Sequence, residues 1–334
     1  MNLPADKDSR ARIVLRKLKW MAIGILAPEA IVCVAVSEWC DAKFVCKELW
    51  PSKTGRELAH GFLIGMGGII ISTTDQERIR LQVDDFVQAV KRGIIDLPVL
   101  ESKEIEDKSK ADWVSKSVAC VQIGWLLTQV IGRTAQHISV TPLEMFALGI
   151  VVCAITTYGF WWQKPFDVQT PVVINTELDF STLESRLAAE IEDLDIERFP
   201  VHVSLLYSMG TGKGKTQDVF FAVVTATASI LFGLCHVAAW SFAFPTFWER
   251  LLWQVSAIAC VTLPVTIVGL AWVWREQDWS DSTDELIHKL VSIPLFGLYT
   301  IVRVLLLFEV FFSLRSVPPD VYQTVNWAAY IPHI

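Results

Sequence analysis

The sequence predicts an all-α fold: a polytopic transmembrane helical bundle of about seven spans, with amphipathic helices in two long loops. Seven apolar stretches approach the length needed to cross a hydrocarbon core about 30 Å thick. The composition agrees, because 52% of the residues are hydrophobic, 19% are charged, and the mean hydropathy is +0.41. Too little amphipathic sequence remains to cover such helices with another protein layer, which excludes a soluble helical protein. We expect one membrane domain over 1–334, with spans at 20–38, 58–74, 113–132, 141–163, 217–240, 251–274 and 290–314.

Tryptophans mark the ends of most stretches, as expected for side chains that prefer the headgroup level. Trp20 and Trp39 bracket the first stretch, which at 1.5 Å per residue would span about 28 Å. The fourth stretch ends at Trp161 and Trp162, where we expect Lys164 to snorkel outward to the headgroups. All five residues are predicted interface anchors. The alternative for Lys164 is contact with a phosphate headgroup or a metabolite.

The second stretch, 58–74, is short and contains four glycines. It either crosses the membrane, which gives seven spans, or forms a re-entrant segment among six spans. We prefer the crossing. Within it, Gly61-x-x-x-Gly65 is typical of a face that another helix approaches closely.

The two long loops contain patterns of helical spacing. In 75–112, an amphipathic helix on the membrane or against the bundle is predicted by Leu81, Phe86, Val87, Val90 and Ile94. In 164–216, Ser181 or Thr182 is expected to cap a helix over 182–197. Its apolar stripe consists of Leu183, Leu187, Ile191 and Leu194.

The basic residues predict the orientation. If all seven stretches cross, one side holds 21 Lys or Arg, in 1–19, 75–112, 164–216 and 275–289 together with Lys116; the other side holds 7. Because positive residues are retained in the cytoplasm, we expect a cytoplasmic N-terminus and an external or lumenal C-terminus. The first stretch would be an uncleaved anchor in the plasma membrane or an endomembrane. The expected partners are the lipid bilayer and a small-molecule ligand; the sequence leaves the oligomeric state open.

The motifs of common catalytic and binding sites are missing. Gly210-Thr-Gly-Lys-Gly-Lys-Thr216 resembles a phosphate loop but has Met209 where the first glycine is required, so no nucleotide is expected. No Cys or His spacing predicts a metal site, and no cofactor is expected. No basic stripe with interleaved aromatic residues suggests nucleic acid.

Ionisable and polar groups inside the apolar stretches are the stronger signal, because a charge at bilayer depth is costly unless it is paired or hydrated. We expect Glu29, Arg303 and Glu309 to face the bundle interior, with Glu29 as the partner of Arg303. They either line a polar cavity or hold the helices together, and the sequence does not choose. The full set of candidates is Glu29, Gln122, Gln129, Arg133, Glu144, His236, Arg303 and Glu309.

Several short motifs give the chain a family resemblance. They are Ala27-Pro-Glu29, His60-Gly61 with Met66-Gly-Gly68, Asp107-Lys-Ser-Lys-Ala-Asp112, Gln129-x-x-x-Arg133, Thr141-x-Leu-Glu144, Trp161-Trp-x-Lys-Pro-x-Asp-Val168, His236-x-x-x-Trp240, Phe244-Pro-Thr246 with Glu249 and Leu252-Trp253, Arg303, Glu309-Val310 and Pro332-His333. The chain resembles a large group of paralogous fungal multi-pass membrane proteins with no assigned activity. The resemblance covers nearly the whole chain and implies a fungal source and a membrane location.

Three functions remain open. The preferred one is transport or handling of a small molecule through a polar intramembrane cavity. The second is a membrane-embedded enzyme acting on a lipid or terpenoid-like substrate, with Glu29, His236 or Glu309 as acid or base. The third is a receptor or scaffold that signals through the cytoplasmic loops. Whether any catalysis occurs is not predicted.

Overall fold

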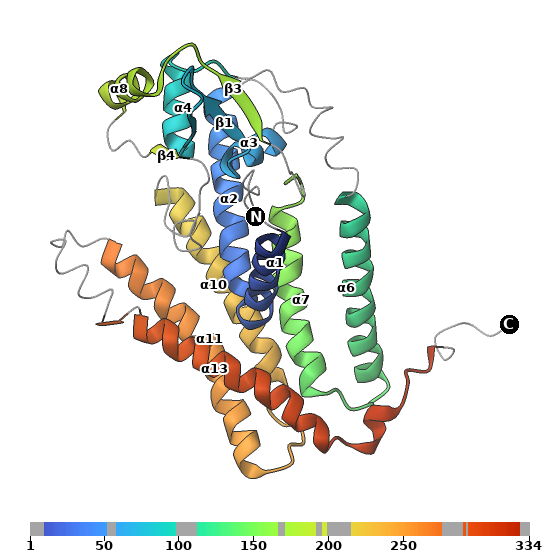
Figure 1. The fold of residues 1–334 in the computed structure, drawn as a ribbon. Coiled ribbons are helices and arrows are strands. Elements are labelled where there is room, and N and C mark those ends of the chain that lie inside the picture. Colours follow the sequence, from blue (N-terminus) through green and yellow to red (C-terminus); the bar gives the residue numbers. More distant parts are fainter. Residues whose placement is uncertain are drawn as a thin grey trace. The chain divides into compact units, whose positions relative to one another are not determined.

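The computed structural model describes residues 10–51, 58–97, 112–165, 171–191, 196–198, 215–275, 290–291 and 293–327. The described chain is mostly helical (Figure 1). It divides into two compact units built from interleaved segments. The first unit comprises Met1–Leu18, Val34–Ser117 and Gly159–Gln217, and the second comprises Lys19–Cys33, Val118–Tyr158 and Asp218–Ile334.

Five helices of the described chain are long and apolar enough to cross a membrane. They are α6 (Asp112–Ala135), α7 (Pro142–Phe160), α10 (Lys215–Ala238), α11 (Phe247–Arg275) and α13 (Ile293–Phe312). Each coincides with one of the last five predicted stretches. Large apolar side chains such as Val121, Ile131 and Phe308 are exposed on these helices, as lipid contact requires. The helices are therefore compatible with an integral membrane protein.

The first predicted stretch, 20–38, is not one helix. It is divided between α1 (Arg10–Leu26) and α2 (Pro28–Leu49), which meet at a bend of 111°. Pro28 has no N–H and disfavours helical backbone at Ala27, so α1 cannot continue. Trp39 consequently lies within α2 rather than at the end of a span. The bent pair is either a sixth, broken span or a re-entrant loop.

The second predicted stretch, 58–74, does not form a spanning helix. It contains the short helix α3 (Leu58–Gly65) followed by strand β1 (Ile69–Ser72). Gly67 has a φ of +77°, a left-handed conformation that suits glycine, and the Gly68 N–H closes the helix end on the Leu63 carbonyl. Three consecutive isoleucines then favour a strand.

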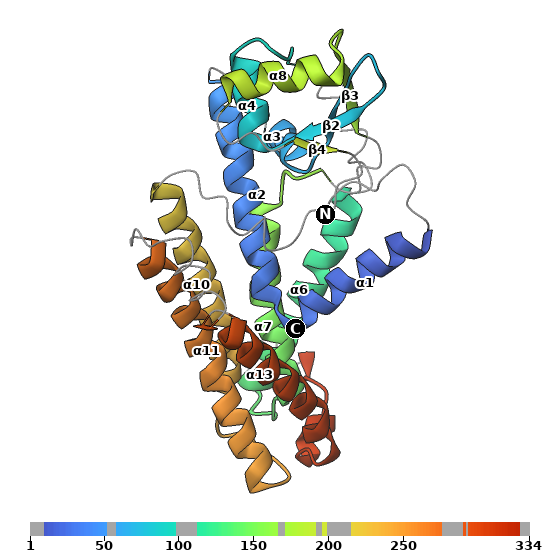
Figure 2. The ribbon, with the colours of Figure 1, turned by 60° about the vertical axis from the view of Figure 1, so that its left-hand side comes forward.

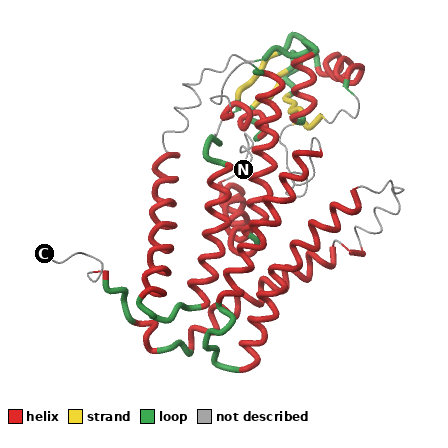
Figure 3. Tube along the Cα trace, turned by 180° about the vertical axis from the view of Figure 1, so that it is seen from behind, coloured by secondary structure: helices red, strands yellow, loops and turns green. Residues whose placement is uncertain are grey.

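An all-α fold is also incorrect, because the first unit contains a four-stranded sheet of order β3-β1-β2-β4 (Figure 2). The other strands are β2 (Arg78–Leu81), β3 (Val172–Asn175) and β4 (Ile196–Arg198). β1 pairs with β2 antiparallel and with β3 parallel, and β2 pairs with β4 antiparallel. The strands occupy a small part of the described chain (Figure 3), and each is too short to give a clear alternation in the sequence.

Two helices in the long loops pack in the core of this unit. They are α4 (Val83–Lys91) and α8 (Phe180–Glu190). Phe86, Val87, Leu183 and Leu187 form one hydrophobic core with Ile79 of β2, so the apolar faces of these helices cover strands. The details differ from the sequence prediction. Leu81 is in β2, Asp179 rather than Ser181 or Thr182 caps α8, and α8 ends at Glu190; Leu194 lies outside the described residues.

The second unit contains α7, α10, α11 and α13 with the 3-10 turns η2 (Ser313–Arg315) and η3 (Pro319–Tyr322). Helices α11 and α13 pack against each other. At Gly233 of α10 a Cβ would lie 2.4 Å from a methyl group of Val261 on α11, so glycine allows close approach there. These contacts bring the ionisable groups of separate helices into one interior.

Candidate functional site

Three polar side chains predicted from the sequence come together inside the second unit. They are Glu29 in the first turn of α2, His236 near the end of α10, and Arg303 in the middle of α13. Their exposed fractions are 6%, 0% and 2%. We call these residues, with Tyr299, the Arg303 cluster.

Arg303 is paired with Glu29, as the sequence analysis predicted. The Arg303 Nη2 atom lies 3.7 Å from Glu29 Oε2, and the Tyr299 hydroxyl donates a hydrogen bond to Glu29 Oε1. The Arg303 Nε–H donates to the carbonyl of Leu26. That carbonyl is accessible because α1 ends there: the Ala30 N–H, its usual helical partner, donates to Ala27 instead. The break before Pro28 thus provides part of the arginine site.

Aromatic rings form the apolar wall of the cluster. The Arg303 guanidinium lies 3.8 Å from the ring centroid of Phe232 and 5.9 Å from that of Phe146, within cation–π range. The His236 ring lies 4.5 Å from the Phe232 ring. Gly149 on α7 makes room for these rings, since a Cβ there would lie 3.0 Å from Phe232 and 3.1 Å from His236.

Hydrogen bonds hold His236 in one orientation. Its Nδ1 lies 2.8 Å from the carbonyl of Phe232, so Nδ1 carries the proton and the neutral ring presents Nε2 as an acceptor. The Trp253 indole N–H donates to the His236 carbonyl over 3.1 Å, which fixes the end of α10 against α11.

Four buried polar atoms of the cluster have no hydrogen-bond partner among the described residues. They are Glu29 Oε2, Arg303 Nη1, Arg303 Nη2 and His236 Nε2. Buried polar groups are normally hydrogen-bonded, and exceptions need an explanation. Together these atoms offer several N–H donors and two acceptors to a guest molecule.

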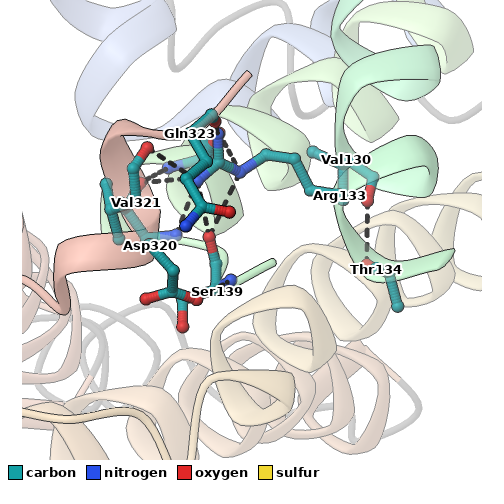
Figure 4. Close-up of polar contacts among 9 residues, drawn as sticks. Val130, Arg133, Thr134, Ser139, Asp320, Val321 and Gln323 are labelled. Carbon is teal, nitrogen blue, oxygen red and sulfur yellow. Dashed lines mark hydrogen bonds and ion pairs between the residues drawn. The ribbon is translucent and has the colours of Figure 1, made fainter. Parts of the chain in front are cut away.

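Arg133 and Glu144 belong to a different arrangement, at the end of α6. Figure 4 shows Arg133 beside Ser139, Val321 and Gln323. Arg133 donates to the carbonyls of Ser139, Val321 and Gln323 over 2.7 to 3.2 Å. Its Nε lies 3.5 Å from Glu144. The backbone N–H of Ser139 donates to Asp320, and this hydrogen bond lowers the pKa of Asp320. We call this set of contacts the Arg133 clamp.

Glu144 also closes the N-terminus of α7. The Thr141 N–H donates to Glu144 over 2.7 Å, and the Glu144 N–H donates to the Thr141 hydroxyl over 3.2 Å. This is a capping box, and it explains the Thr141-x-Leu-Glu144 motif without a ligand. Beside it, Thr141, Ser241 and Ser313 help to line a cavity of about 220 Å³.

The remaining candidates do not join the Arg303 cluster. Glu309 is buried at 4% exposure, but it lies near Glu249, which pairs with Arg315. Gln122 is exposed on α6 and Gln129 is half-buried there. No group of three or more His, Cys, Asp or Glu in the described parts of the chain could hold a metal ion. Gly210 to Gly214 lie outside those parts.

The predicted outward path of Lys164 is wrong. Lys164 is buried at 9% exposure in the first unit, 2.5 Å from Glu38 of α2 and 4.1 Å from the ring centroid of Trp161. The ammonium group is paired with a carboxylate and lies over an indole ring, so its charge is compensated inside the unit. Trp162, in contrast, is 58% exposed, as an interface anchor would be, and Trp20 is half-buried.

Sequence reasoning missed the aromatic half of the cluster. Tyr299 and Arg303 are four residues apart on α13, and Phe232 and His236 are four apart on α10, so each pair shares a helix face. This spacing could have identified Tyr299 and Phe232 as neighbours of Arg303 and His236. The contacts between α2, α10 and α13 had no local signal.

The comparisons with known proteins give one finding. A family model described as a family of unknown function (DUF8562) matches residues 1–195 and 195–334. Neither the curated proteins nor the solved structures contain a match.

Proposed function

Because the chain belongs to the DUF8562 family, whose function is unknown, we propose a function from the Arg303 cluster itself. The protein is an integral membrane protein of several spans that binds a small molecule at this cluster and moves it through the bundle. The resemblance to fungal multi-pass proteins, which have no assigned activity, supports the membrane location alone.

The observation that carries this proposal is the incomplete hydrogen bonding of Arg303. A buried guanidinium with two nitrogens that make no hydrogen bond, one of them held only by an ion pair at 3.7 Å, is destabilising for a protein that uses it only as packing. A guest with acceptor atoms would satisfy both. Helix ends and aromatic rings meeting at one point inside a bundle are typical surroundings of ligand sites.

The Arg133 clamp shows how this chain satisfies an arginine whose role is structural. There, all three guanidinium nitrogens donate to backbone carbonyls. At Arg303 only Nε does so. The contrast within one unit supports a binding role for Arg303 over a role as internal glue.

The proposed topology has five crossings, with α1 and α2 forming a re-entrant hairpin. The sheet supports it: β1 and β2 precede α6 and β3 follows α7, so an even number of crossings separates them. The charges support it too. The side containing 1–57, 75–116, 164–216 and 275–289 then holds 25 Lys or Arg, against 3 on the other. The N-terminus and the sheet would be cytoplasmic, and the C-terminus external or lumenal.

Two native cysteines allow a test of access to the cluster. Cys260 and Cys153 are 0% and 1% exposed, and both lie within electrostatic range of Glu29 and Arg303. If the cluster lies on a solute path, a small water-soluble methanethiosulfonate at pH 8 should label both thiols in sealed membranes. Peptide mass spectrometry would locate the label.

Two positions serve as controls for the labelling. A Tyr322→Cys variant, at a position 79% exposed outside the spans, reports that the reagent works. Cys120, exposed on α6, should face lipid and stay unlabelled. Labelling of Tyr322→Cys with none at Cys260 or Cys153 until the protein is unfolded would identify a closed structural core and reject the proposal.

A membrane-embedded enzyme is the second candidate, and one observation favours it. The bond from Nδ1 to Phe232 leaves His236 Nε2 as a base of fixed orientation, which general-base catalysis requires. Recovery of a chemically changed product from a bound lipid, lost in His236→Ala, would select this candidate over transport.

A further inference from the structure

We infer that the guest of the Arg303 cluster is a carboxylate monoanion that carries a hydrogen-bond donor close to the carboxylate and an apolar body. This inference rests on the proposed function and names the class of molecule that the cluster would take.

The anion follows from the guanidinium. Arg303 Nη1 and Nη2 make no hydrogen bond among the described residues, although Nη2 is ion-paired with Glu29, and the planar fork that they form matches the two oxygens of a carboxylate. Nε is already occupied by the Leu26 carbonyl, which fixes the orientation of the fork. A neutral amide could accept from only one of the two nitrogens in the same way.

A single negative charge follows from the other charges of the cluster. Arg303 is its only cation, and Glu29 already supplies one carboxylate. A phosphate dianion would leave an excess of negative charge in a buried site, which is costly. A monoanion is accommodated if Glu29 takes up a proton from water when the guest displaces it from Arg303, because the net charge of the cluster then stays at zero.

The position of Glu29 would allow a guest carboxylate to displace it from Arg303. Its Oε1 accepts from Tyr299, while its Oε2 remains 3.7 Å from Arg303 without a hydrogen bond. Glu29 therefore compensates the charge of Arg303 without occupying the hydrogen-bonding positions of Nη1 and Nη2. A guest carboxylate would compete with Glu29 for the same cation.

The rest of the guest is defined by His236 and the aromatic wall. His236 Nε2 is an acceptor at 0% exposure with no hydrogen-bond partner among the described residues. A hydroxyl or N–H group of the guest could donate to it. Phe232 contacts both Arg303 and His236. The carboxylate of the guest would accept from Arg303, and a donor close to it would reach His236 Nε2. The apolar body of the guest would lie along the Phe232 ring.

Mandelate has these three features and serves as the probe. Phenylacetate lacks its hydroxyl, mandelamide lacks its charge, and inorganic phosphate replaces the carboxylate. Thermal unfolding of the purified full-length protein in detergent, measured against probe concentration, gives the dissociation constant of each. We expect mandelate to stabilise the protein, phenylacetate to bind about ten-fold more weakly, and mandelamide and phosphate to have no effect.

Variants assign the effect to the cluster. Arg303→Gln combined with Glu29→Gln leaves no unpaired buried charge and should abolish stabilisation by mandelate. The matched control Arg315→Gln, at a half-exposed arginine paired with Glu249, should keep it. Glu29→Gln alone removes the competing carboxylate and should bind mandelate about ten-fold more tightly. His236→Ala should remove the preference for mandelate over phenylacetate.

Either of two results would overturn the inference: equal stabilisation by mandelamide and mandelate, or stabilisation by mandelate that survives in the double variant. Binding of phosphate in place of the carboxylates would also reject the monoanion. If Cys260 is accessible to the water-soluble reagent and no carboxylate binds, the ligand class is wrong while the proposed function stands. If Cys260 is inaccessible, the proposed function is rejected, and the inference about the ligand class, which rests on it, is rejected with it.

Discussion

Arg133 and Arg303 are both buried in the second unit, with exposed fractions of 8% and 2%, yet their surroundings differ. Arg133 is surrounded by backbone carbonyls, one from the nearby Ser139 and two from Val321 and Gln323, which are distant in the chain. Arg303 is surrounded by one carbonyl, one carboxylate and aromatic rings. The first arrangement uses all three guanidinium nitrogens as donors and is typical of a structural residue; the second leaves Nη1 and Nη2 without a hydrogen bond among the described residues.

Replacing Arg133 should therefore destabilise the fold strongly. Arg133→Met would leave the carbonyls of Ser139, Val321 and Gln323 without their donor and Glu144 without its partner, at a cost of about 3 kcal/mol. Thermal or urea unfolding in detergent would measure the loss. Arg315→Met, which breaks a half-exposed pair with Glu249, should cost at most about 1 kcal/mol. Equal losses for the two variants would contradict the structural role of the Arg133 clamp.

At the scale of elements, glycines decide where helices can meet. Gly61 of α3 lies against α2, and a Cβ there would come within 2.5 Å of the Ala42 carbonyl. Gly65, four residues later, has open space at the same position. The Gly61-x-x-x-Gly65 pattern thus serves close packing at its first glycine, within the first unit, as glycines in such patterns commonly do.

Gly61→Ala should consequently destabilise the first unit by about 2 kcal/mol, because both contacting atoms are backbone and cannot move aside. Gly65→Ala is the matched control and should change stability by less than about 1 kcal/mol. Amide hydrogen exchange of α2 and α3 would show the difference locally. A Gly61→Ala protein with unchanged protection would mean that the two helices separate at little cost.

The N-terminus of α8 depends on the charge of Asp179. Hydrogen bonds from Ser181 and Thr182 lower the pKa of Asp179 to about 2. Because the folded-state pKa lies below the unfolded value of about 4, the stabilising contribution is fully present above about pH 4 and is lost as the pH falls through about 2. In Asp179→Ala, hydrogen exchange of α8 should be faster at pH 6 than in the wild type. The difference should shrink at the lowest pH, and a constant difference would exclude an ionised cap.

At the scale of the whole molecule, apolar helices and short sheet strands alternate along the chain. The sheet links a segment before α6 to a segment after α7, and the loops next to these strands, 75–116 and 164–216, hold 13 of the 29 Lys and Arg residues. Together these features favour five crossings over the seven suggested by the apolar stretches. The proposed five crossings would place the ends of the chain on opposite sides of the membrane, as the seven-span interpretation also would.

Cysteine labelling in intact cells would test this topology. Ala11→Cys, on α1, and Glu184→Cys, on the exposed face of α8, should react with a membrane-impermeant reagent only after the membrane is opened. Tyr322→Cys should react without opening. Labelling of Ala11→Cys and Tyr322→Cys from the same side would require an even number of crossings and make the bent pair a true span.

The sequence by itself determined the apolar helices from 113 onward, because length and hydropathy are local properties that a bilayer selects directly. It also indicated that Glu29, Arg303 and Glu309 avoid the lipid, because the cost of a charge in an apolar environment does not depend on the fold; Glu29 was a candidate partner of Arg303, and the structure has this pair. It could not determine that 58–74 is a helix and a strand, since three isoleucines suit either a span or a buried strand.

Only the tertiary structure decided which partners each group obtains. Lys164 is buried beside Glu38 because α2 and the end of α7 meet in the first unit, a contact with no trace in the local sequence. Arg133 finds four backbone bonds and Arg303 one for the same reason: hydrogen-bond partners come from segments distant in the chain. Local chemistry thus indicated that Glu29, Arg303 and Glu309 are buried, and the packing of distant helices decided which hydrogen-bond partners each buried group obtains.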